Sequence, residues 1–68
     1  MTKNDRLVIL KFIHLHRMIN KEAEALGIKS NDAQFFREHP DFPVWNKLRL
    51  QVKKLDSKWL DEYIDPRS

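Results

Sequence analysis

The sequence predicts an all-α protein with three helices, at about residues 5–26, 31–38 and 43–63. Apolar residues recur at steps of three and four along both long segments, which is the spacing of one helix face. The residues that break helices are few and fall at the ends of these segments: Gly27, Pro40, Pro43 and Pro66. A chain of 68 residues has room for one small domain, so residues 1–68 are expected to fold as a single unit.

The first helix is predicted from about residue 5 to residue 26. Its apolar face consists of Val8, Phe12, Leu15, Ile19, Ala23 and Leu26. We expect Asn4 to be the N-cap, and Gly27 to follow the C-cap, where a left-handed backbone favours glycine. Further apolar residues lie on other faces of the N-terminal half. Residues 6–13 are therefore either a helix buried on several sides or a short strand.

A short second helix is predicted over residues 31–38, with Ser30 or Asn31 as its N-cap. His39 should lie outside it, because a residue before proline avoids helical geometry. The third helix, at about residues 43–63 with Asp41 as its cap, has the most regular apolar spacing in the chain. That spacing is formed by Trp45, Leu48, Val52, Leu55, Trp59 and Tyr63.

The composition excludes several classes of protein. Charged residues interrupt the most apolar stretch, residues 7–19, so no segment has the roughly 20 apolar residues that span a membrane. No signal-peptide cleavage pattern follows this stretch, and we expect a cytoplasmic protein. The chain has no cysteine, so neither disulfides nor thiolate ligands are available. The formal charge of +3 permits binding to nucleic acid without requiring it.

Residues for catalysis or metal binding do not form a recognisable pattern. His14 and His16 are two positions apart, which places them on roughly opposite faces of a helix, although on a strand they would share a face. No suitably spaced carboxylate completes a metal site, and a single glycine cannot form a phosphate-binding loop. We therefore expect no enzyme activity, no cofactor, no metal and no small-molecule substrate.

Residues 21–38, KEAEALGIKSNDAQFFRE, resemble the helix-turn-helix motif of small DNA-binding regulators. Ala23 lies four positions before Gly27, Ala33 six after it, and Phe36 nine after it. A small residue at Ala23 permits close helix crossing, and the glycine permits a tight turn. The same residues also fit an ordinary helix–glycine–helix corner in which they only pack together.

The resemblance implies that residues 31–38 form a recognition helix that enters the major groove of double-stranded DNA. Asn31 and Gln34 would then contact adenine edges, and Lys29 and Arg37 would contact phosphate or guanine. Residues 39–43 and 55–63 extend a resemblance to the excisionase and AlpA-like regulators of phages.

Two further surfaces are predicted. Arg49 and Lys53 form a cationic stripe beside the apolar face of the third helix, which would either follow a phosphate backbone or only keep the helix soluble. Apolar residues outside the main stripes predict a surface for a second copy of the chain or for another protein. These residues are Leu7, Leu10, Leu50 and Leu60.

From the sequence we therefore expect a small DNA-binding transcription regulator or excisionase-like protein of phage or mobile-element type. The alternative is a helical protein-interaction module, such as an inhibitor or adaptor that docks on a larger protein.

Overall fold

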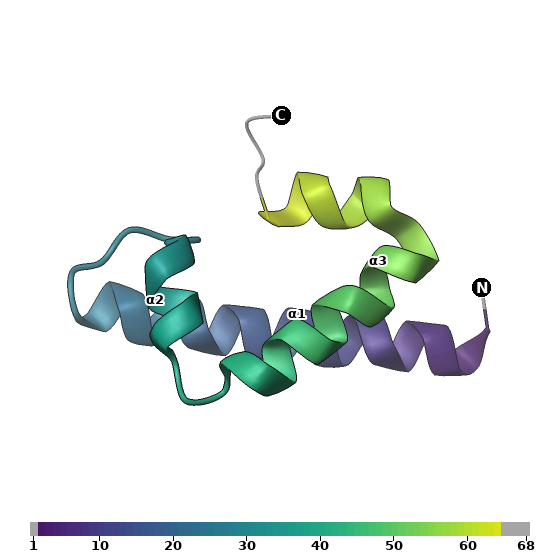
Figure 1. The fold of residues 1–68 in the computed structure, drawn as a ribbon, viewed down its shortest axis with the longest axis horizontal. Coiled ribbons are helices and arrows are strands. Elements are labelled where there is room, and N and C mark those ends of the chain that lie inside the picture. The colour runs from purple at the N-terminus through teal and green to yellow at the C-terminus, as the bar shows by residue number, and fades with distance from the viewer. Residues whose placement is uncertain (1, 65–68) are drawn as a thin grey trace.

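The computed structural model describes residues 2–64, which form three α-helices and no strand. They are α1 (Lys3–Ala25), α2 (Ala33–Glu38) and α3 (Phe42–Ile64), shown in Figure 1. The predicted all-α architecture is confirmed. The alternative of a strand at residues 6–13 is wrong, because these residues lie within α1. Pro66 is outside the described residues.

α1 begins earlier than predicted because Thr2, not Asn4, is its N-cap. The backbone N–H of Asp5 donates to the Thr2 hydroxyl at 3.1 Å, and the Thr2 N–H donates to the Asp5 carboxylate at 3.2 Å. This reciprocal pair is a capping box, in which each side chain accepts from the other residue's backbone N–H.

α1 ends at Ala25 with Leu26 as its C-cap, and Gly27, whose φ is +74°, follows the C-cap as predicted. The Gly27 N–H donates to the carbonyl of Glu24 at 3.0 Å, and the Ile28 N–H donates to that of Ala23 at 2.8 Å. These two bonds define a Schellman motif, which satisfies the last carbonyls of a helix. The predicted core residue Leu26 is instead 69% exposed, because it is the C-cap, where the chain leaves the helix axis.

α2 is shorter than predicted. Its N-cap is Asp32, whose carboxylate accepts the Phe35 N–H at 2.9 Å, so neither Ser30 nor Asn31 has that role. Asn31 has a φ of +61° and lies outside the helix. His39 also lies outside it, with the extended backbone expected before Pro40.

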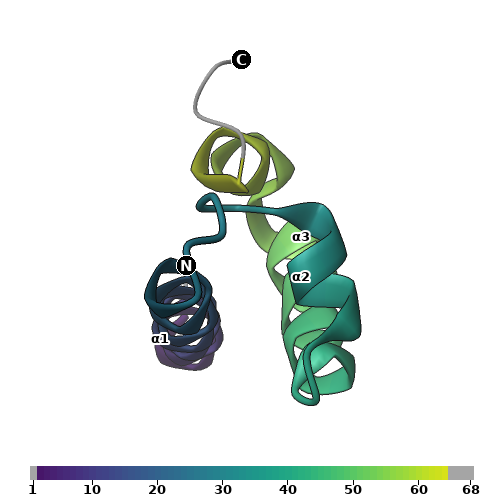
Figure 2. The same ribbon diagram turned by 90° about the vertical axis from the view of Figure 1, so that its left-hand side faces the viewer.

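α3 is not the continuous helix that its spacing predicted. Asp56 has a φ of −160° and a ψ of 86°, which breaks the helix axis at this residue. Its carboxylate accepts the Trp59 N–H at 3.0 Å and so caps the final segment. That segment runs back along the preceding part of α3 (Figure 1), and in the end-on view α1 and the two parts of α3 form a triangle (Figure 2).

The kink changes which leucines of α3 face the interior. Leu60, predicted to lie on a partner surface, is only 1% exposed. Leu55, predicted to be buried, is 38% exposed. Both predictions assumed a straight helix, whereas the break at Asp56 rotates the final segment, which contains Leu60, and leaves Leu55 as the last residue before the break. Leu60 is therefore a core residue and is no longer a candidate for partner binding.

The core lies between α1 and α3, which pack against each other, and α2 covers one end (Figure 2). Its buried apolar residues are Phe12, Ile19, Ala23, Phe36, Trp45, Val52 and Leu60. No helix within residues 2–64 is long and apolar enough to cross a membrane.

Candidate functional site

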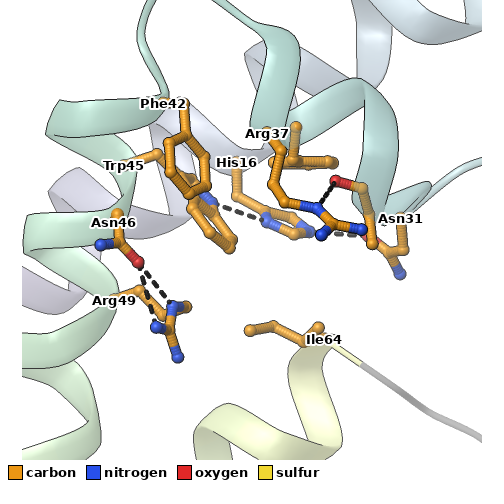
Figure 3. A pocket seen from close by; sticks show the side chains of 10 residues that line it. His16, Asn31, Arg37, Phe42, Trp45, Asn46, Arg49 and Ile64 are labelled. Carbon is orange, nitrogen blue, oxygen red and sulfur yellow. Dashed lines mark hydrogen bonds between the residues drawn. The ribbon is translucent and has the colours of Figure 1, made fainter.

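A buried histidine lies where the three helices meet. The side chain of His16, on α1, is inside the core, and the residue is only 3% exposed. Its Nδ1 accepts a hydrogen bond from the indole Nε1–H of Trp45 at 3.2 Å, and its Nε2 lies 2.8 Å from the amide oxygen of Asn31 (Figure 3). An indole nitrogen can only donate, so Nδ1 must be unprotonated and Nε2 must carry the proton. His16 is therefore neutral here.

Burial lowers the pKa of His16 below its ordinary value, and the hydrogen bond to Asn31 opposes this effect. A proton added at Nδ1 would place two N–H donors opposite each other, at His16 and Trp45. The geometry and the loss of solvent therefore both favour the neutral ring.

Asn31 fixes the loop between α1 and α2 to the side of α1. Its amide oxygen also accepts a hydrogen bond from Nδ2 of Asn20 at 2.9 Å, and its own backbone N–H donates to Oδ1 of Asn20 at 2.9 Å. Asparagine tolerates the left-handed backbone found here better than most residues do. Asn31, predicted to contact an adenine edge, thus has its amide oxygen hydrogen-bonded inside the protein.

An open pocket of about 330 Å³ lies beside this network (Figure 3). Aromatic side chains form much of its wall, and Ile64 lies across from them (Figure 3). Arg37 of α2 and Arg49 of α3 lie on either side of the pocket (Figure 3). Among residues 2–64, no carboxylate lines it. The lining residues within 2–64 are His16, Asn31, Ala33, Phe36, Arg37, Phe42, Trp45, Asn46, Arg49 and Ile64. The pocket is therefore apolar within and cationic at its edge.

Arg49 is held in place before any ligand arrives. Its Nε and Nη2 donate to the amide oxygen of Asn46 at 3.2 and 3.0 Å, and its guanidinium carbon lies 5.8 Å from the centre of the Trp45 ring. Arg37 is held more loosely, by one bond of 3.4 Å from Nε to the carbonyl of Ala33. Both guanidinium groups keep further N–H donors for another partner.

Three of the six residues predicted to bind DNA converge on this pocket: Asn31, Arg37 and Arg49. Lys29, Gln34 and Lys53 are exposed and do not line it. The amide of Gln34 donates to the carboxylate of Glu38 at 3.4 Å along α2. Sequence reasoning missed His16 and Trp45 as a polar pair, because they are 29 positions apart and each also fits an apolar stripe.

Charge is distributed unevenly along the two long helices. Residues 6–21 of α1 and residues 42–55 of α3 contain lysine and arginine but no aspartate or glutamate. The acidic residues of the described chain lie near the two ends of α1, in or beside α2 and its connections, and in α3 from the kink at Asp56 onward. Each long helix therefore presents an uninterrupted basic stretch.

The outward side of α1 is partly apolar. Leu7, Leu10 and Met18 are exposed there, and a shallow groove follows the same side. The groove is lined by Leu10, Ile13, His14, Arg17, Met18 and Lys21. Leu50, on α3, is also exposed. Three of the four leucines predicted to face a partner are thus accessible, and only Leu60 is not.

The two other histidines take no part in the buried network, and His14 is exposed. Nε2 of His39 lies 2.6 Å from the Glu22 carboxylate and so joins the α2–α3 turn to α1. Within residues 2–64, no three histidine, cysteine, aspartate or glutamate side chains are grouped as a metal site requires.

Comparison with protein-family models, with curated proteins and with solved structures found no match for this chain. The resemblance of residues 21–38 to a helix-turn-helix motif stays a prediction.

Proposed function

We propose that this chain is a small DNA-binding regulatory protein without catalytic activity, and that it binds through α2 and the first part of α3. The observation that carries this proposal is the pair Arg37 and Arg49. They come from separate helices and line one pocket, and no carboxylate of residues 2–64 lies beside them in its wall. Two such guanidinium groups are suited to neighbouring phosphates of a nucleic-acid backbone.

Exposed lysines extend this basic face. Lys53 follows Arg49 by one helical turn and so adds positive charge near it, and Lys29 adds positive charge to the loop before α2. Phosphate contacts of this kind release counterions, which makes affinity fall steeply with salt. On this proposal Gln34 is the amide side chain available to a base, and Asn31 positions the loop.

Fluorescence anisotropy with labelled duplex DNA tests the proposal. Affinity should fall steeply between about 50 and 200 mM salt, and losing one phosphate contact should reduce the slope of log K against log salt by about 0.9. Arg37→Ala and Arg49→Ala should each show this reduction. Arg6→Ala removes an exposed arginine from the start of α1 and is the matched control. Absence of binding at the lower salt, or an equal effect of Arg6→Ala, would contradict the proposal.

A second candidate function, docking on another protein, is favoured by the outward side of α1. Leu7, Leu10 and Met18 are exposed within the basic stretch of residues 6–21. A homodimer through this side would bring Arg17 and Lys21 of both copies into one interface, with no acidic residue at positions 6–21 to offset the repulsion. An acidic partner surface is therefore better suited than a second copy.

Size-exclusion chromatography with light scattering separates these arrangements. The chain should be monomeric, because its exposed α1 side repels itself. A dimer that Leu10→Glu dissociates would instead show that this side pairs with its own copy.

A further inference from the structure

The pocket beside Trp45 has flat apolar walls. The ring centres of Phe36 and Trp45 are 5.1 Å apart, and those of Phe42 and Trp45 are 5.8 Å apart with an angle of 29° between the planes. Ile64 adds an apolar side chain opposite these rings (Figure 3). Phe36 and Trp45 are only 4% and 8% exposed, so a planar aromatic group would contact the exposed parts of these rings, by offset stacking or edge-to-face packing.

The polar groups of the pocket favour an anion. Arg37 and Arg49 make no ion pair with a carboxylate of residues 2–64, in which both ion pairs involve His39. The amide oxygens of Asn31 and Asn46 already accept two hydrogen bonds each. The pocket therefore offers strong donors, and its amide oxygens are occupied. A carboxylate supplies the complementary charge and acceptors.

The size of the pocket limits the ligand. A volume of about 330 Å³ lies at the lower end of the roughly 300–1,000 Å³ of small-molecule sites. One or two rings with a single acidic group fit this space better than a folded peptide does.

We propose that this pocket binds a small aromatic carboxylate, with its ring against Phe36 and Trp45 and its carboxylate between Arg37 and Arg49. The ligand is bound and not turned over. The site needs no nucleic acid, but it uses the arginines of the proposed DNA-binding face, so ligand and DNA should compete.

Calorimetric titration with 2-naphthoate tests the charge requirement, because 2-naphthamide has the same ring and no charge. The acid should bind at least about tenfold more tightly, as expected for charge-assisted hydrogen bonds. Cyclohexanecarboxylate keeps the charge without the planar ring and should also bind more weakly. Equal binding of acid and amide, equal binding of the non-planar acid, or no heat with millimolar 2-naphthoate would overturn the proposal.

Nuclear magnetic resonance locates the site in the same titration. The indole Nε1–H of Trp45 and the Nε–H of Arg49 should shift, whereas amides of the outward α1 groove should not. Arg37→Gln should weaken binding about tenfold; Arg37 is exposed, so the variant should fold. Arg6→Gln is the matched control. Shifts confined to the α1 groove, or an equal loss from Arg6→Gln, would overturn the assignment.

Titrations without DNA keep the two proposals separable. Binding of 2-naphthoate by a chain that binds no duplex would support the pocket and contradict the DNA-binding proposal. Binding of duplex DNA without any binding of 2-naphthoate would support the DNA-binding proposal and contradict the pocket proposal.

Discussion

The two sides of α1 reverse the usual placement of polar and apolar residues. Its inward side buries the polar ring of His16, while its outward side exposes Leu7, Leu10 and Met18. The buried ring is tolerated because both of its nitrogens are hydrogen-bonded. The outward residues have no such compensation within residues 2–64, and their alignment on one helix side suits a contact with another molecule. The inward side should therefore determine stability, and the outward side should affect it little.

Replacing Phe12 tests the inward side with the largest expected effect. This ring is fully buried and lies against Trp45 and Tyr63 at centre distances of 5.8 and 6.1 Å. Phe12→Ala should lower the free energy of unfolding by about 3–5 kcal/mol, from lost burial and the cavity left behind. Leu10→Ala, on the outward side, should change it by no more than about 0.5 kcal/mol. Urea unfolding measures the free energy of unfolding of both variants. Similar losses in the two would contradict the distinction between the inward and outward sides of α1.

A matched pair of leucines extends this comparison to α3. Leu60→Ala should cost about 2–5 kcal/mol, because the kink at Asp56 turns Leu60 into the core. Leu55→Ala should cost much less, since Leu55 is more than one-third exposed. The same unfolding measurement applies. A larger loss from Leu55→Ala would indicate a straight α3 of the kind predicted from spacing.

Replacing His16 tests whether the hydrogen bonds of its ring offset the free-energy cost of burying a polar group. His16→Leu should cost about 1–3 kcal/mol, because the Trp45 N–H is left buried without an acceptor. Trp45→Phe should then be less costly in the His16→Leu protein than in the original chain. This double-mutant cycle isolates the pair, and additive effects would show that the hydrogen bond contributes nothing.

The smallest expected effect is a dependence of stability on pH. The pKa of folded His16 lies below its ordinary value of 6.5, which approximates the unfolded chain. Between these two values the unfolded state binds more protons, so stability should fall as pH decreases through this window. At pH values well above 6.5, the titration of His16 should not affect stability.

Unfolding midpoints measured from about pH 8 to pH 5 check this dependence. Comparing the original chain with His16→Leu cancels the contribution of the other histidines, which both proteins share. The difference in stability between the two proteins should shrink toward low pH. A difference that grows toward low pH would mean that the folded ring is preferentially protonated.

Candidate-site residues were partly identifiable from sequence. Arg37 is predicted from the helix-turn-helix resemblance and Arg49 as a cation beside the apolar face of the third helix, and the structure places both at one pocket. Asn31 was named as a base-contacting residue, yet its amide oxygen is bound to His16 and Asn20. Which polar groups pair across the core depends on three-dimensional approach, since the partners of His16 are 15 and 29 positions away.

The sequence by itself determined the three helices and the Gly27 corner, because helix periodicity and positive φ at a C-terminus depend on nearby residues. The tertiary structure decided the kink at Asp56, the burial of Leu60 and the pocket. Apolar spacing continues through Asp56 from Leu55 to Trp59, so the local pattern cannot distinguish one straight helix from two. The break allows the final segment to fold back and bury Leu60 in the core, and such long-range packing is absent from local spacing.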